Sequence, residues 1–103
     1  MTWRGDVKKH FENVDKAFDV LNLVELDDIP LRNGIRGIIL EEMKQACKSI
    51  INWLNTDNNE YCKKASLFLE NFELGYDICV IIEARCFIYN MLDKSLYELL
   101  TVN

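Results

Sequence analysis

The spacing of apolar residues along the chain predicts a series of helices. In the first thirty residues they recur at alternating steps of four and three, which lays one stripe along an amphipathic helix: Val7, Phe11, Val14, Phe18 and Leu21. Asp6 is a suitable cap for the start of this helix. The opposite face carries charges of both signs and is expected to face water.

Residues 23–34 interrupt the pattern and predict a connector. They hold two adjacent aspartates, the only proline and an Asn-Gly pair, all of which favour turns over helix interiors. A second helix is predicted from about Ile35 to Leu54, where one face is again apolar, with Ile39, Met43, Cys47 and Ile50.

Two further helices and a short fifth one are predicted after the polar turn at residues 55–59. Asp57 and Glu60 have the spacing of a capping box that starts the third helix, and Gly75 is placed to end it. The fourth helix is predicted over residues 77–92, because a lone strand in this apolar segment would have no partner. Ser95 and Glu98 predict a final capping box.

Together these elements predict an all-α protein. The chain has 103 residues, which suits a single helical domain over residues 1–103, and four glycines with one proline disfavour a many-stranded β-sandwich. We expect a compact bundle of four to five helices. Because residues 77–92 are apolar on nearly every side, we expect their helix to lie at the centre, surrounded by the others.

The charge of the chain restricts the class of partner. Seventeen acidic and twelve basic residues give a net charge of −5, which repels phosphate backbones and argues against nucleic-acid binding. An acidic molecule suits a cationic protein partner, although an ordinary solvated surface explains the same charge. Residues 31–56 are the exception, with four basic and two acidic residues.

Targeting signals and cysteines indicate the compartment. The first residues contain no apolar core of the kind that a secretory signal needs, and the longest unbroken apolar run, Ile78–Ile82, is far shorter than the roughly 20 residues that span a bilayer. We therefore expect a cytoplasmic protein without a membrane partner. The cysteines occur singly within helical patterns and are interpreted as reduced thiols that pack as small hydrophobes: Cys47, Cys62, Cys79 and Cys86.

Two charged residues, Glu83 and Arg85, lie inside the most apolar segment. Residues two apart on a helix point about 200° apart, so these side chains cannot pair with each other. Each therefore needs its own partner or access to water. Two interpretations remain open: both reach solvent along their aliphatic stems, or one side of this helix is an interface, with Phe87 and Tyr89 as neighbours.

No catalytic or metal-binding constellation is evident. A stripe of polar and sulfur-containing residues follows one face of the fourth helix and could line a pocket or a zinc site: Tyr76, Cys79, Glu83, Cys86 and Asn90. No C-x-x-C pair accompanies it, so we predict neither a metal nor a cofactor. His10 is the only histidine and is expected on an exposed surface, so we predict that the chain is not an enzyme.

One short motif resembles a known family. Arg85 followed five residues later by Asn90 resembles the Arg-x4-His motif of HEPN-domain ribonucleases, which are also helical bundles and act on RNA. Asn90 stands in the position of the histidine and cannot act as a general acid or base near neutral pH. The resemblance covers six residues and implies a degenerate HEPN-like domain that acts on RNA through Arg85.

The favoured hypothesis is a small acidic protein that neutralises a basic protein such as a toxin or nuclease, as inhibitors and immunity or antitoxin proteins do. One alternative is this HEPN-like role. The other is a structural or regulatory homo-oligomer, such as a homodimer, formed by the fourth helix or by the Val7–Leu21 stripe. The residues predicted to bind a partner are Asp15, Asp19, Asp27, Asp28, Glu70, Glu73, Asp77, Glu83, Arg85 and Tyr89.

Overall fold

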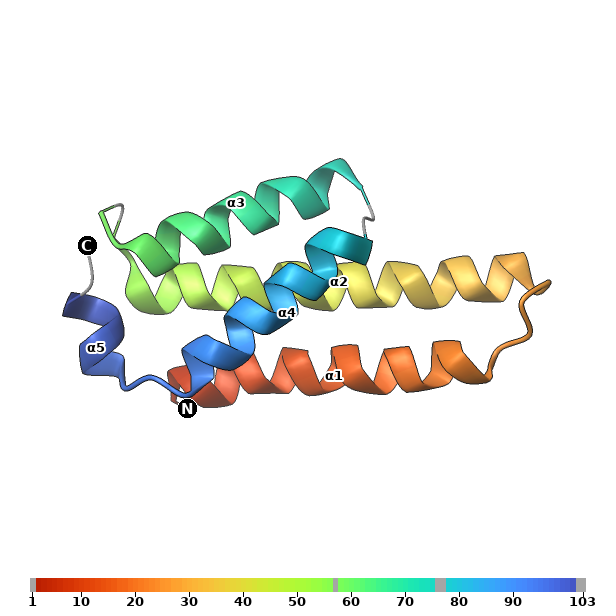
Figure 1. Cartoon of the computed structure of the whole chain (residues 1–103), viewed down its shortest axis with the longest axis horizontal. Coiled ribbons are helices and arrows are strands. Elements are labelled where there is room, and N and C mark those ends of the chain that lie inside the picture. Colours follow the sequence, from red (N-terminus) through yellow and green to blue (C-terminus); the bar gives the residue numbers. More distant parts are fainter. Residues whose placement is uncertain (1, 57, 76–77, 102–103) are drawn as a thin grey trace.

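The computed structural model describes residues 2–56, 58–75 and 78–101. This part of the chain forms five helices and no strand, which confirms the predicted all-α bundle (Figure 1). The helices are α1 (Trp3–Leu23), α2 (Ile29–Leu54), α3 (Glu60–Leu74), α4 (Ile78–Leu92) and α5 (Leu96–Thr101). None of the described helices is long and apolar enough to cross a membrane.

The position of the most apolar helix differs from the prediction. The long helices α1 and α2 form an antiparallel pair, α3 runs along the other side of α2, and α4 crosses the bundle diagonally (Figure 1). The helix between two neighbours is therefore α2, and the expected central position of residues 77–92 is wrong. Helix α4 buries one face and exposes the other, and the buried residues are Ile81, Ala84, Ile88 and Met91.

The core is built from the apolar faces that their spacing predicted. On α1 the buried residues include Val7, Phe11, Val14 and Leu21, and they pack against the predicted face of α2. This stripe is therefore used inside the monomer. The hypothesis of a symmetric interface made by the Val7–Leu21 stripe is contradicted, because burying it against a second copy would remove it from α2.

The connector between the first two helices is shorter than predicted. Helix α2 begins at Ile29, six residues before the expected start, because the Asp28 carboxylate accepts a hydrogen bond from the Leu31 N–H at 3.3 Å and caps it. Pro30 lies in the first turn, where a missing N–H costs nothing. The Asn-Gly pair at residues 33–34 lies within the helix.

The caps of the other helices correct two local predictions. Thr2 rather than Asp6 caps α1, since its hydroxyl accepts the Gly5 N–H at 3.1 Å. Asn59 caps α3, and Asp57 lies outside the described residues. Gly75 follows the last residue of α3 with φ +151°, which confirms its predicted place, and Ser95 accepts the Glu98 N–H at 3.1 Å at the start of α5.

Two arginines hold the ends of neighbouring helices. Arg32 Nη1 donates to the carbonyl oxygens of Leu21 and Val24, both at 3.2 Å, at the end of α1. At the end of α4, Arg4 Nε donates to the Leu92 carbonyl oxygen at 2.8 Å. Arg4 Nη2 also donates to the carbonyl oxygen of Lys94. The last carbonyls of a helix lack the usual partner one turn on. Leu21 O also accepts the Val24 N–H at 3.2 Å, so Arg32 adds a second donor there, and Arg4 supplies a donor at the end of α4.

Candidate functional site

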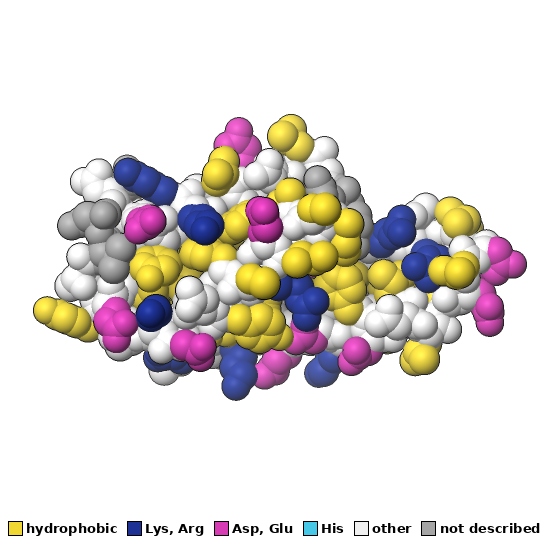
Figure 2. Space-filling model, viewed as in Figure 1, with side chains coloured by type: hydrophobic (Ala, Val, Ile, Leu, Met, Phe, Trp, Pro, Cys, Tyr) yellow, Lys and Arg dark blue, Asp and Glu magenta, His cyan; other side chains and the backbone are white. Residues whose placement is uncertain are grey.

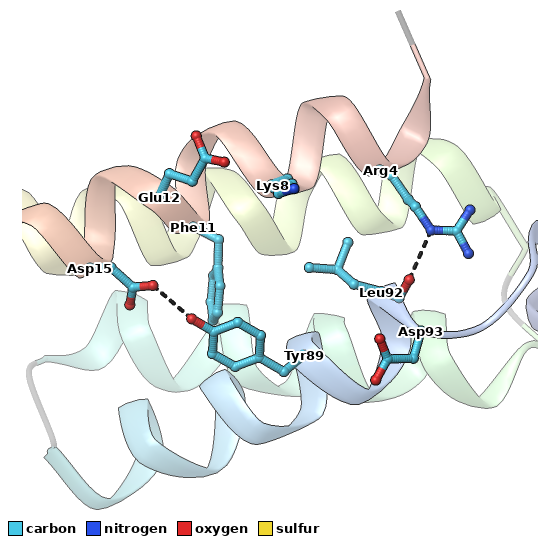
Figure 3. A pocket seen from close by; sticks show the side chains of 8 residues that line it. All are labelled: Arg4, Lys8, Phe11, Glu12, Asp15, Tyr89, Leu92 and Asp93. Carbon is cyan, nitrogen blue, oxygen red and sulfur yellow. Dashed lines mark hydrogen bonds between the residues drawn. The ribbon is translucent and has the colours of Figure 1, made fainter.

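Three of the predicted partner-binding residues meet where α4 crosses α1. Arg85 and Tyr89 lie one turn apart on α4 and both contact Asp15 of α1. Arg85 Nη2 is 2.5 Å from Asp15 Oδ1. The Tyr89 hydroxyl donates to Asp15 Oδ2 at 2.6 Å (Figure 3). Both oxygens of this carboxylate are therefore used within the chain.

Arg85 is held between an anion and an aromatic ring. Its guanidinium carbon lies 5.0 Å from the centre of the Phe18 ring, and its Nε is buried without a hydrogen-bond partner among the described residues. Asp15 is the only anion within ion-pair distance of Arg85 in the described chain. The charge of Arg85 is thus compensated within the chain. Arg85 neither extends freely into solvent nor stands unpaired as an anchor for a partner, so neither sequence-based interpretation describes it.

Tyr89 connects this cluster to the aromatic core. Its ring meets Phe11 edge to face, with the ring centres 4.8 Å apart. The hydrogen bond to Asp15 and, to a lesser extent, burial raise the pKa of the Tyr89 phenol above 10.0, whereas Arg85 acts in the opposite direction. The phenol is therefore held in its neutral, donating form.

A groove of about 430 Å³ lies beside this cluster, between α1 and α4; we call it the α1–α4 groove. Its floor is apolar and aromatic and its edges carry charges of both signs (Figure 3). The lining residues are Arg4, Lys8, Phe11, Glu12, Asp15, Tyr89, Leu92 and Asp93. Such a mixed groove suits an apolar side chain of a partner whose neighbours are polar.

A second groove of about 500 Å³, the α3–α4 groove, lies on the other side of α4. It is lined by Lys64, Phe68, Ile82, Glu83, Cys86, Phe87 and Asn90. The centres of the Phe87 and Phe68 rings are 5.6 Å apart, and Lys64 Nζ lies 5.4 Å from the centre of the Phe87 ring. Glu83 thus faces α3 while Arg85 faces α1, which confirms that the two charges point to different sides of the helix.

A strip of exposed side chains, which we call the α4 ridge, follows the outer side of α4: Ile78, Cys79, Ile82, Cys86 and Tyr89. Ile82 and Cys86 also line the α3–α4 groove, and Tyr89 lines the α1–α4 groove. Figure 2 shows hydrophobic side chains gathered over the middle of this face. Sequence reasoning left open that one side of this helix is an interface, but of the ridge residues it named only Tyr89, because the expected central position assigned the other apolar residues to the core. The sequence pattern that pointed to this exposed side was the polar and sulfur-containing stripe, whose members Cys79, Glu83 and Cys86 are all exposed. The first residue of that stripe, Tyr76, lies outside the described residues.

The other predicted partner-binding residues do not join this site. Asp19, Asp27 and Asp28 are exposed on α1 and in the connector, and Asp28 also caps α2. Glu70 and Glu73 are exposed on α3, and Glu70 lines a shallow hollow with Ser66 rather than the α3–α4 groove. Asp77 lies outside the described residues. These acidic groups are distributed around the molecule instead of forming one site.

The cysteines are thiols in two different environments. Cys47 and Cys62 are buried as predicted, and burial raises the pKa of the Cys47 thiol to about 12. Cys79 and Cys86 are exposed on the α4 ridge, so their predicted role in packing is wrong. In the part of the chain that the structure describes, no three His, Cys, Asp or Glu side chains gather in a way that could hold a metal ion.

The remaining chemical candidates are separated in space. Asn90 lines the α3–α4 groove, whereas Arg85 contacts α1, so this pair does not converge on one point as residues acting together on RNA would. His10, expected to be exposed, is partly buried and its Nδ1 lies 2.7 Å from Glu42 Oε2. Comparison of the chain with protein-family models, curated proteins and solved structures found no significant match.

Proposed function

We propose that this chain works by binding another protein and that the α4 ridge is the surface presented to that partner. The observation that carries the proposal is the exposure of Ile82, 53% at the middle of the ridge, on the most apolar helix of the chain. Burial of apolar surface is favourable by about 25 cal/mol per Å². An uncovered apolar strip beside grooves offers that gain to a partner helix or loop.

Charge indicates a cationic partner. The chain carries a net charge of −5. Most acidic side chains are exposed and form no ion pair with any described residue, among them Asp19, Glu25, Asp27, Glu70 and Glu73. Three of the four arginines, Arg4, Arg32 and Arg85, bond within the fold, whereas the lysines, like these acidic groups, form no ion pair with any described residue. The resulting negative field speeds encounter with a basic surface.

These features favour an inhibitor or immunity-type role, in which the chain neutralises a basic protein such as a toxin or nuclease. No catalytic step belongs to this role, since Arg85 is neutralised by Asp15. We expect no cleavage when the purified chain is incubated with structured RNA. Cleavage that disappears in Arg85→Ala would contradict the proposed role and support the HEPN-like alternative.

Two substitutions that add the same charge test the ridge. Ile82→Asp places a carboxylate on the ridge, and Leu67→Asp places one on α3, where Leu67 is 59% exposed and lines neither groove flanking α4. Proteins recovered from native extract on the immobilised chain would be purified and their affinity measured by titration calorimetry. We expect the basic partner to bind Ile82→Asp at least tenfold more weakly and Leu67→Asp with unchanged affinity.

Salt dependence supplies the second measurement. Because the charge acts over a distance, the association rate of the partner should fall steeply between 50 and 300 mM salt, while the dissociation rate, which reflects ridge contacts, should change little. A partner that binds wild type, Ile82→Asp and Leu67→Asp with equal affinity would contradict the assignment of the ridge. An association rate that is independent of salt would contradict the cationic partner.

A further inference from the structure

A third groove lies on the face of the α1–α2 pair that is turned away from α4. Along α1, Lys8, Phe11 and Asp15 line the groove towards α4, whereas Lys16, Ala17 and Val20 line this outer one. The outer groove measures about 310 Å³ and is completed by Ile35, Ile38 and Glu42 of α2. No other described helix lines it, so it is formed by α1 and α2 alone.

The floor of the outer groove is apolar although it faces solvent. Ala17 and Ile35 reach it from the core, while Val20 and Ile38, on either side, are 50% and 55% exposed. Four apolar side chains from two adjacent helices therefore meet here, and none of the other described helices lines the groove above them. A second pair of helices would bury them in the manner of a four-helix bundle.

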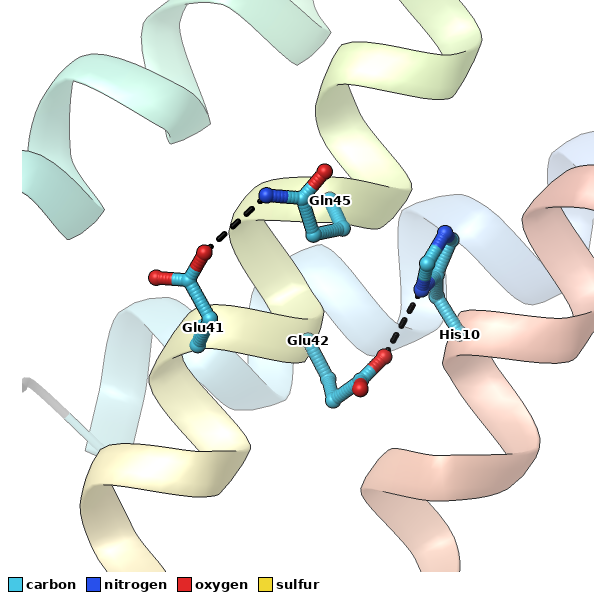
Figure 4. A network of polar contacts seen from close by, with 4 residues as sticks. All are labelled: His10, Glu41, Glu42 and Gln45. Carbon is cyan, nitrogen blue, oxygen red and sulfur yellow. Dashed lines mark hydrogen bonds and ion pairs between the residues drawn. The ribbon is translucent and has the colours of Figure 1, made fainter.

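Opposite charges border the two sides of this groove. Lys16 stands on the α1 side and forms no ion pair with any described residue. Glu42 stands on the α2 side, where His10 contacts its Oε2 at 2.7 Å and orients the carboxylate (Figure 4). The groove thus has a cation along one helix and an anion along the other.

We propose that two copies of this chain form a symmetric dimer through their outer grooves. A two-fold axis parallel to the helices lays α1 of each copy on α2 of the other. Lys16 and Glu42 line the same groove and so lie at similar heights along the helices. This axis therefore brings Lys16 of each copy to Glu42 of the other, twice per dimer, whereas an axis perpendicular to the helices would bring the two Lys16 side chains together.

The size of the face sets the expected strength. Two adjacent helices about 30 Å long and each about 10 Å wide present roughly 600 Å² per copy. Stable interfaces bury about 600–1,000 Å² per partner, so this face lies at the lower limit. We therefore expect a dimer that dissociates in the micromolar range. This association is independent of the proposed function, because the α4 ridge lies on another face.

Charge reversal tests the pairing. Lys16→Glu and Glu42→Lys each place like charges opposite one another twice, so sedimentation velocity from 1 to 200 µM should show each variant as a monomer, with at least a tenfold weaker association. An equimolar mixture of the two variants restores both pairs and should form a heterodimer. The double variant Lys16→Glu/Glu42→Lys should form a homodimer again. Glu73→Lys makes the same charge change on α3, where Glu73 is exposed and does not line the outer groove; it is the control and should leave the dimer intact.

Two further results would overturn the proposal. A wild-type chain that sediments as a monomer at 200 µM removes the dimer. A dimer that survives both single charge reversals but is lost in Ile82→Asp uses the α4 ridge instead of the outer groove. Circular dichroism of each variant establishes that the helices are retained, and recovery in the mixture cannot arise from a folding defect.

Discussion

Arg85 of α4 and Asp15 of α1 lie 2.5 Å apart although 70 positions separate them in the chain. Their contact, together with the hydrogen bond from Tyr89, joins α4 to α1. It lies beside the buried face of α4, which leaves the α4 ridge on the outer side of the helix.

Removing the carboxylate should therefore destabilise the fold. Asp15→Ala removes the ion pair with Arg85 and the hydrogen bond from Tyr89. The Arg85 side chain is 31% exposed and the Asp15 side chain 40%. For a pair of this exposure we expect a loss of about 1–2 kcal/mol in the free energy of unfolding in urea. Asp19→Ala, on the same helix without such contacts, should change it by less than about 0.5 kcal/mol.

A double-mutant cycle separates the ion pair from the rest of the effect. Combining Asp15→Ala with Arg85→Ala should show a coupling energy of about 1 kcal/mol, because each single change leaves the other charge partly buried. A coupling energy near zero would mean that water screens the pair and that it does not hold α4 in place.

Tyr89 should make stability decrease at high pH. Its phenol has a raised pKa in the folded chain, so the contribution is complete below the unfolded value of about 10 and is lost as the pH rises through the folded value. Urea unfolding from pH 8 to 11.5 should show that the advantage of wild type over Tyr89→Phe shrinks above pH 10. Parallel curves for the two proteins would contradict the raised pKa.

Asn59 should be the most important of the helix caps. Its side chain is buried, accepts the N–H groups of Tyr61 and Cys62 at 2.9 and 3.2 Å, and donates to the Leu99 carbonyl, which ties α3 to α5. Asn59→Ala should cost about 2 kcal/mol, since it leaves buried groups unsatisfied. Asp28→Ala, at an exposed cap, should cost no more than about 1 kcal/mol in the same denaturation experiment.

Two glycines should respond in opposite directions to the same substitution. Gly37 lies inside α2 with open space around it, so Gly37→Ala should stabilise the protein by up to about 1 kcal/mol. Gly75 has φ +151°, which an L side chain rarely adopts, so Gly75→Ala should destabilise it by about 1 kcal/mol or more. Thermal unfolding would measure both; stabilisation by Gly75→Ala would show that this backbone conformation is not required.

The elements were largely predictable because their signals are local. Val7, Phe11 and Val14 face the core since an apolar period of 3.6 residues creates one buried face wherever the helix packs. Local signals failed where they were ambiguous: Pro30 indicated a turn, yet proline is also well accommodated in the first turn of a helix, and α2 starts at Ile29.

What only the tertiary structure decided is how the helices cross. The sequence by itself determined an all-α chain, the core faces of α1 and α2, and opposite directions for Glu83 and Arg85. It did not determine which side of α4 is covered, because a helix that is apolar on most sides gains similarly from burying any of them. The crossing of α4 is set by partners distant in the chain, such as Asp15, and no pattern within residues 78–92 contains that information.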